Sequence, residues 1–418
     1  MTAEKVAELI ADRINDPVRL SGAVAAMARQ SRYADVLPWR PASLSGGSAG
    51  LAVVCAALDV HRPGDGWDRA GHQHLATAVA ASSPYDVSLF SGLAGIGLAA
   101  TLLAGGRPRY ERLLSSLDAA VGPAVISAAR QLRVADGCAA SDHDLISGLT
   151  GTGAYLLARP RGDALTAALT ALTRLLAGTG HPRSWHTPAD MTVGTLRDYF
   201  PDGHHNCGIA HGVPGPLALL ALAILDGAEV PGARDAIEAT ATWLADHRVG
   251  TADAPDWPDA VALDDPGPAR SATAEPGRAA WCYGSIGVAR SLWLAGTALG
   301  RSEWRDLAAR TIRAVAARPP ERWWLTTSGL CHGRAGLLRV LQRFAADLDD
   351  PALAATAETL AARLAAEYDP DTLLGMRVAE PGGVLVDHPG LLDGVPGVAL
   401  ALLGPAPGPS WDRMLLLS

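Results

Sequence analysis

The chain has 418 residues, of which 49% are hydrophobic, and it carries a formal net charge of −8 at pH 7. This acidic balance argues against a nucleic-acid-binding protein, and no apolar run reaches the ~18 residues that a membrane-spanning helix needs. The first residues are acidic where a signal peptide would be basic, so we expect a cytoplasmic protein. Five cysteines in such a chain favour thiol chemistry or metal binding over a disulfide framework.

Seven copies of a Leu-x-x-Gly-x-x-Gly motif recur along the chain, and each is followed by an apolar, helix-favouring segment. The copies begin at Leu44, Leu89, Leu145, Ile209, Trp281, Leu330 and Leu391. Self-similarity of this kind is the signature of a repeat architecture. A glycine at the entry to a tightly packed helix permits close backbone approach, because it has no Cβ. The motif therefore predicts architecture and says nothing of function.

Amphipathic segments lie before and between the copies and predict further helices. They are the N-terminal stretch 3–31, followed by 68–83, 109–134, 162–178, 233–247, 302–317 and 351–368. The segments after the glycines are apolar on nearly all sides, which is typical of buried helices. Together they predict an all-α protein, an α/α toroid of seven inner and seven outer helices in a single domain over residues 1–418. Long polar loops at 181–206 and 250–280 lead into motif copies, and we expect them to cover the same pole of the ring.

Alignment of the seven copies isolates a group of metal-capable side chains. The residue before the first glycine is His211, Tyr283 and His332 in copies four, five and six, and one position earlier stand Cys282 and Cys331 in copies five and six. Equivalent positions in a ring point at the same pole, so Cys282 should meet Cys331 and His332, with His211 nearby. Two thiolates and one imidazole suit zinc and leave its fourth position open.

A structural alternative exists for each of these residues. A lone cysteine at a helix start is usually a small buried hydrophobe, and a lone histidine there is more often a hydrogen-bonded cap than a ligand. Clustering in consecutive copies favours the metal site. We interpret Cys55, Cys138 and Cys207, which lie outside the cluster, as structural.

The motifs Trp281-Cys-Tyr-Gly, Cys331-His-Gly and Gly208-Ile-Ala-His-Gly-Val-Pro-Gly resemble the signature of LanC-type lanthionine synthetase cyclases. The resemblance covers nearly the whole chain, and it implies a seven-fold α/α toroid with one zinc ion at one pole. It further implies that Cys282, Cys331 and His332 hold that ion.

The resemblance also implies roles for four other residues. His211 would be the acid/base residue, while Asp144, Arg278 and Tyr283 match further pocket residues. Two alternatives stay open, since Asp144 is also a good helix N-cap and Arg278 could simply pair with a carboxylate in the adjacent loop. Some members carry a small inserted domain between early helix pairs. Residues 95–151 hold one helical segment and little else, so the leader contact of such an insertion is not expected here.

The activity implied by the resemblance is the addition of peptide Cys thiols to dehydroalanine or dehydrobutyrine, which forms lanthionine or methyllanthionine rings. The implied substrate is a dehydrated precursor peptide with a leader, and the implied partners are a separate dehydratase and an exporter. One alternative is a relative that adds glutathione to dehydroamino acids at the same zinc site. Another is a non-catalytic zinc toroid scaffold, in which a fourth protein ligand would close the site.

Overall fold

The computed structural model describes residues 1–36, 38–132, 137–178, 185–192, 196–263, 277–405 and 410–418. These residues fall into two compact units, the first made of 1–118 with 325–411 and the second of 119–324 with 412–418. Across the described ranges the structure has 17 α-helices and only short strands. The prediction of a predominantly helical protein is therefore confirmed, whereas the single-domain assignment stays a prediction.

Seven helices follow the seven motif copies. They are α3 (Ser48–His61), α5 (Leu93–Ala104), α8 (Leu149–Leu157), α11 (Pro214–Leu225), α13 (Ser285–Leu299), α15 (Arg334–Leu348) and α17 (Val395–Leu403). As predicted from their composition, α3, α5, α8, α11 and α17 are buried along most of their length. The motif glycines sit where the chain passes over itself. At Gly212, for example, a Cβ would collide with the backbone carbonyl of Asn206.

The amphipathic segments between the copies also form helices, within a few residues of their expected ends. They are α4 (Trp67–Ala80), α6 (Glu111–Gln131), α9 (Asp163–Ala177), α12 (Ala233–Asp246), α14 (Ser302–Ala317) and α16 (Pro351–Ala366). In α9 the buried stripe includes Leu165, Ala168, Leu169 and Leu172, the spacing that places side chains on one helical face.

The N-terminal stretch 3–31 differs from the expectation of one helical stretch, because it forms two helices. Helix α1 spans Ala3–Asn15, and α2 spans Pro17–Gln30. The break has a local cause. Asp16 accepts hydrogen bonds from the backbone N–H groups of Val18 and Arg19, and Pro17 occupies the first position of α2, where its missing N–H costs nothing.

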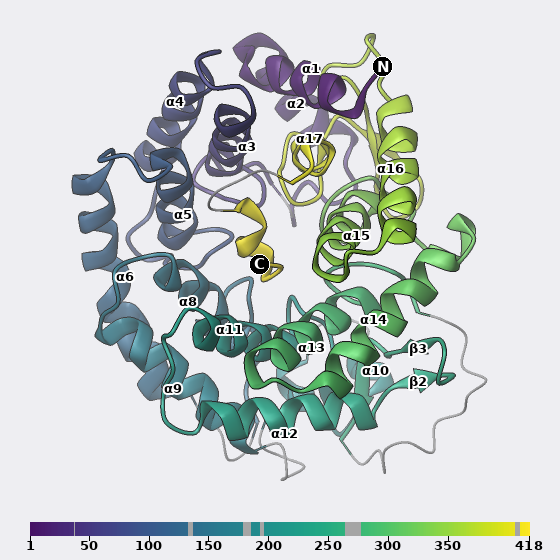
Figure 1. The fold of residues 1–418 in the computed structure, drawn as a ribbon. Coiled ribbons are helices and arrows are strands. Elements are labelled where there is room, and N and C mark those ends of the chain that lie inside the picture. Colours follow the sequence, from purple (N-terminus) through teal and green to yellow (C-terminus); the bar gives the residue numbers. More distant parts are fainter. Residues whose placement is uncertain (37, 133–136, 179–184, 193–195, 264–276, 406–409) are drawn as a thin grey trace. The chain divides into compact units, whose positions relative to one another are not determined.

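Each unit has its own arrangement of helices (Figure 1). In the first unit α17 contacts α1, α3 and α15, while α3 packs on α4 and α5, and α15 packs on α16. In the second unit α11 contacts both α8 and α13, and the amphipathic helices α9, α12 and α14 pack against this row. No helix among the described residues is long and apolar enough to cross a membrane.

The described parts of the two long loops pair with each other. Strand β1 (His204–Asn206) runs antiparallel to β4 (Ala260–Ala262), with Asn206 opposite Ala260. The β2–β3 ladder (Val249–Gly250 with Pro255–Asp256) stands at the beginning of the second loop. Residues 181–184, 193–195 and 264–276 of these loops lie outside the described residues. Strand β1 stands directly before the fourth motif copy in the sequence. The placement of both loops over one pole stays a prediction.

The remaining elements are short. Helices α7 (Ala140–His143) and α10 (Leu196–Tyr199) and the 3₁₀ turns η2 (Ala189–Met191) and η3 (Pro320–Trp323) belong to the second unit. The β5–β6 ladder (Val378–Ala379 with Leu385–Val386) belongs to the first, and η4 spans Trp411–Leu415.

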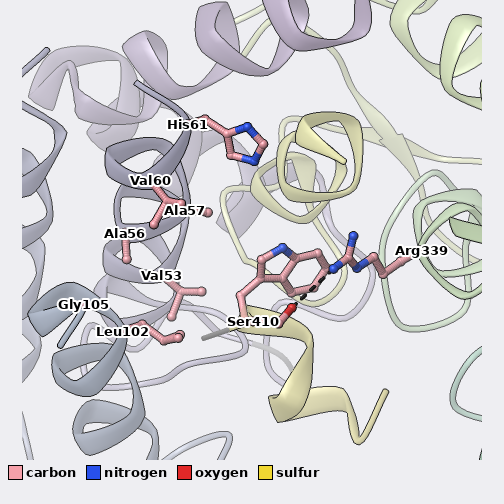
Figure 2. A pocket seen from close by; sticks show the side chains of 10 residues that line it. Val53, Ala56, Ala57, Val60, His61, Leu102, Gly105, Arg339 and Ser410 are labelled. Carbon is pink, nitrogen blue, oxygen red and sulfur yellow. Dashed lines mark hydrogen bonds between the residues drawn. The ribbon is translucent and has the colours of Figure 1, made fainter. Parts of the chain in front are cut away.

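A buried arginine holds the last part of the first unit. The guanidinium of Arg339 lies 5.0 Å from the centroid of the Trp411 ring and donates a hydrogen bond to Ser410, beside a small pocket lined by His61 (Figure 2). These contacts fix residues 410–411 against α15.

Candidate active site

Cys282 lies in the second unit, two residues before the glycine at which α13 begins. Its side chain is buried, and the preceding Trp281 is anchored by a hydrogen bond from its Nε1 to the carbonyl of Leu415 at 3.0 Å. Gly284, the N-cap of α13, has φ of +137°, a region that side-chain-bearing residues rarely adopt. The motif glycine thus permits the turn that presents Cys282 at the start of a rigid helix.

Cys331 and His332 occupy the matching place in the first unit, directly before α15. The backbone N–H of Cys331 donates to the carbonyl of Leu392 at 2.9 Å, which ties the turn to the seventh motif copy. The same copy supplies Asp393, whose Oδ1 lies 3.5 Å from His332 Nδ1. Metal-binding histidines commonly have such a carboxylate beside the ring.

The predicted ligand set fits zinc by its chemistry. One ligand atom from each of Cys282, Cys331 and His332 lies within 4.8 Å of the other two. Two sulfurs and an imidazole nitrogen are donors that zinc prefers, and Asp393 at Nδ1 of His332 is the outer partner that such a site commonly carries. Searched over the described residues, only this group of His, Cys, Asp and Glu side chains has metal-binding geometry.

His211 is joined to Asp144 by a direct hydrogen bond. The distance from His211 Nδ1 to Asp144 Oδ2 is 2.7 Å, and the His211 side chain is 38% exposed whereas that of Asp144 is 3% exposed. The other carboxylate oxygen accepts from the backbone N–H groups of Ser147 and Gly148 at 2.7 and 2.9 Å. Asp144 is not the N-cap of α8, which is Gly148; it follows α7 as its C-cap. Its side chain instead bonds the turn before α8 and contacts His211.

Tyr283 lies beside His211 in the second unit. The two rings stack with centroids 5.9 Å apart. The Tyr283 hydroxyl oxygen accepts a hydrogen bond from Asn206 Nδ2 at 2.8 Å. Burial raises the pKa of Tyr283 to about 12, so the phenol keeps its proton at neutral pH.

Arg278 completes this group and makes the contact that its structural alternative predicted. Its guanidinium lies 3.6 Å from Asp259 in the second long loop and 5.6 Å from the centroid of the Tyr283 ring. Its Nε is buried without a hydrogen-bond partner among the described residues. An ion pair between Arg318 and Asp256, 3.0 Å apart, holds the backbone of Gly277, the residue before Arg278. Asp256 accepts from the N–H of Gly277, and Arg318 donates to the carbonyl of Gly277.

The three cysteines outside the motif cluster are buried, as the structural interpretation predicted. Burial raises the pKa of the Cys55 thiol and of the Cys138 thiol to about 12, and it also raises the pKa of Cys207. Neutral, inaccessible thiols are poor nucleophiles and poor metal ligands.

Comparison with known proteins decides the family. The family model described as lanthionine synthetase C-like protein matches residues 38–416. The chain belongs to this family. The nisin biosynthesis protein NisC of Lactococcus lactis subsp. lactis is 24% identical over 310 residues, which are 72% of this chain and 73% of NisC. A solved structure of nisin cyclase matches with a TM-score of 0.76 and 21% identity over 95% of this chain and 97% of that chain. The predicted fold class, an α/α toroid, is thereby confirmed.

Three polar residues of this lanthionine synthetase C-like chain were not assigned roles from the sequence. They are Asn206 on Tyr283, Asp259 on Arg278 and Asp393 on His332. Only Asp393 had a visible signal, because it occupies the same motif slot in copy seven that His332 occupies in copy six. Asn206 and Asp259 come from loops whose pairing no repeat pattern encodes.

Proposed function

We propose that this lanthionine synthetase C-like chain is a zinc-dependent cyclase of a ribosomal precursor peptide. It adds Cys thiols of the peptide to dehydroalanine or dehydrobutyrine residues of the same peptide, and the products are lanthionine and methyllanthionine rings. The observation that carries the proposal is the ligand-atom cluster of Cys282, Cys331 and His332, together with the His211–Asp144 pair. The family and the likeness to NisC support the same activity.

Cys282, Cys331 and His332 would hold the zinc ion, with Asp393 orienting His332. When bound, zinc would supply a Lewis acid that lowers the pKa of a substrate thiol, whose usual value of about 8.5 leaves it mostly protonated at neutral pH. Three protein ligands leave one position for that thiol. His211 is bonded to Asp144 and does not belong to the ligand-atom group found among the described residues, which supports an acid/base role over that of a fourth ligand.

His211 is the group that we assign to proton transfer. With its Nδ1–H donating to the carboxylate of Asp144, the neutral ring carries its lone pair on Nε2. Nε2 takes the proton released by the substrate thiol and returns it to the α-carbon after addition. The S–Cβ bond forms as the Cα=Cβ π bond breaks, one proton moves from sulfur to carbon, and nothing is oxidised or reduced.

Charge develops on the carbonyl oxygen of the dehydro residue while the enolate exists. Tyr283 and Arg278 lie next to His211 in the second unit, and either a hydroxyl or a guanidinium stabilises such an oxygen. The proposal also implies a separate dehydratase that acts before this chain and an exporter that acts after ring closure.

The experiment uses the full chain, zinc and a pre-dehydrated peptide that contains Cys and dehydroalanine or dehydrobutyrine residues. Unreacted thiols are alkylated and counted by mass spectrometry, because ring closure itself changes no mass. We expect the alkylatable thiols to disappear with the parent chain and with Cys138→Ala, but not with Cys282→Ala. A parallel reaction with glutathione and the same peptide separates the alternative activity. Adducts of glutathione in place of rings would contradict the proposal.

A further inference from the structure

Asn206 is held firmly at the end of β1. Its side chain is buried, its backbone is opposite Ala260 in the β1–β4 ladder, and its carbonyl accepts from the N–H of Val213 at 3.2 Å. Gly212 passes so close that any side chain there would strike the Asn206 backbone and amide. Asn206 is therefore part of the rigid entry to the fourth motif copy, next to His211.

The orientation of the Asn206 amide follows from its two partners. Its Oδ1 accepts a hydrogen bond from the backbone N–H of Gly208 at 2.9 Å, and a backbone N–H can only donate. The NH₂ group must then face Tyr283, where Nδ2 lies 2.8 Å from the hydroxyl oxygen. The direction of this hydrogen bond is thus set by the Gly208 backbone.

Because Asn206 donates to the Tyr283 hydroxyl oxygen, the hydroxyl proton does not point at Asn206. Tyr283 has one O–H donor, and because its oxygen already accepts from Asn206, that donor is available to another group. The Tyr283 ring stacks with that of His211, and the Arg278 guanidinium lies over the Tyr283 ring. The hydroxyl therefore stays close to the group that we assign to proton transfer.

We infer that Asn206 is a positioning residue for ring closure, which directs the Tyr283 proton toward the carbonyl oxygen of the dehydro residue. The inference rests on the proposed function. As the thiolate adds to Cβ, the π electrons move through Cα onto that oxygen, and the Tyr283 O–H···O bond strengthens with the growing charge. When His211 delivers a proton to Cα, the electron pair returns and Tyr283 keeps its own proton.

The decisive variant is Asn206→Asp. A carboxylate keeps the shape of the side chain and still accepts a hydrogen bond from the Gly208 N–H. It cannot donate to Tyr283, and it instead accepts a hydrogen bond from the Tyr283 hydroxyl group. We expect kcat to fall by roughly 10²-fold, the effect of losing one oxyanion donor, with little change in KM or zinc content. Tyr283→Phe removes the same proton, so Asn206→Asp should change the rate of Tyr283→Phe by less than about twofold.

A pH series adds a readout that a purely structural role would not move. In Asn206→Asp, a protonated carboxyl group can donate a hydrogen bond to the Tyr283 oxygen as the amide does. Only the ionised carboxylate is restricted to accepting a hydrogen bond from the Tyr283 hydroxyl. The ratio of the Asn206→Asp rate to the parent rate should therefore fall as pH rises, across the range in which both keep their zinc. A ratio that does not change with pH, or an equal loss of rate in the parent and Tyr283→Phe backgrounds, would overturn the inference.

The tyrosine Raman doublet tests the hydrogen-bond direction without any catalysis. The spectrum of the parent minus that of Tyr283→Phe isolates this one phenol among the 7 tyrosines. We expect an acceptor-type phenol in the parent and a donor-type phenol in Asn206→Asp at high pH. The same donor-type signal in both would refute the role of Asn206. A parent chain that shows the expected Raman signals yet closes no rings would refute the proposed function instead.

Discussion

His211 Nδ1 and Asp144 Oδ2 are 2.7 Å apart, although Asp144 directly precedes the third motif copy and His211 lies in the fourth. The other carboxylate oxygen of Asp144 accepts from two backbone N–H groups. One carboxylate thus ties the turn of the third copy to the histidine of the fourth. This arrangement fixes which nitrogen of His211 faces away from Asp144, and two of the predictions below depend on it.

Replacement of His211 by Asn should separate catalysis from metal binding. The variant should fold and keep its zinc, because we assign the ligands to other residues. Its ring-closure rate on a pre-dehydrated peptide should fall by roughly 10²–10⁴, the usual contribution of a positioned acid/base group. Thiol alkylation with mass spectrometry measures the rate. Loss of zinc in this variant would make His211 a fourth ligand and favour the scaffold alternative.

The two functions of Asp144 can be separated by a matched pair of variants. Asp144→Asn keeps an oxygen for the N–H groups of Ser147 and Gly148, but its NH₂ faces His211 and places the histidine proton on Nε2. We expect near-parent stability and a rate loss of about 10²–10⁴. Asp144→Ala should lose the same activity and also about 1–3 kcal/mol of stability, since it leaves buried donors unpaired. Denaturant unfolding distinguishes them, and equal stability of the two variants would argue against the turn-capping role.

Asp393 should tune zinc affinity without binding the ion. Asp393→Asn weakens the outer partner of His332 Nδ1, so zinc affinity should fall by about 10–100-fold, measured by competition with a chelator. Asp387→Asn is a matched control, because Asp387 pairs with Arg377 and the N–H of Leu373 elsewhere in the same unit. An unchanged affinity in Asp393→Asn would place Asp393 outside the metal centre.

His74 predicts part of the acid sensitivity of the first unit. Its ring bonds to Asn15 Oδ1 at 2.8 Å, and burial lowers the pKa of His74 from 6.5 to about 4. Because the unfolded chain binds this proton more tightly, the contribution of His74 to stability is complete above pH 6.5 and is lost as the pH falls toward 4, by at most about 3 kcal/mol. His74→Gln should flatten the fall in the unfolding midpoint over this window. The exposed His72→Gln on the same helix is the control and should keep the parent slope.

The helices could be predicted because glycine and apolar patterns mark them locally. Gly284 and its counterparts stand at the beginnings of buried helices, and periodic apolar residues such as those of α9 show one buried face. The prediction for residues 3–31 was less accurate. The N-cap Asp16 and Pro17 divide this stretch into two helices, although its amphipathic pattern continues across them.

The site could be predicted only where the repeats carry it. Cys282, Cys331, His332 and His211 stand out because copies one, two, three and seven have Gly, Ser, Asp or apolar residues in the same slots. The contact of Asn206 with Tyr283 could not be found in this way. It depends on the pairing of β1 with β4 and on the direction of an amide, and both are properties of the folded chain.

Zinc content tests the central claim most directly. Elemental analysis of the purified parent, of Cys138→Ala and of Cys282→Ala compares a proposed ligand with a buried cysteine outside the cluster. We predict one zinc ion per chain in the parent and in Cys138→Ala, and its loss from a Cys282→Ala chain that keeps the parent circular dichroism spectrum. Undiminished zinc in that folded Cys282→Ala chain would contradict the account.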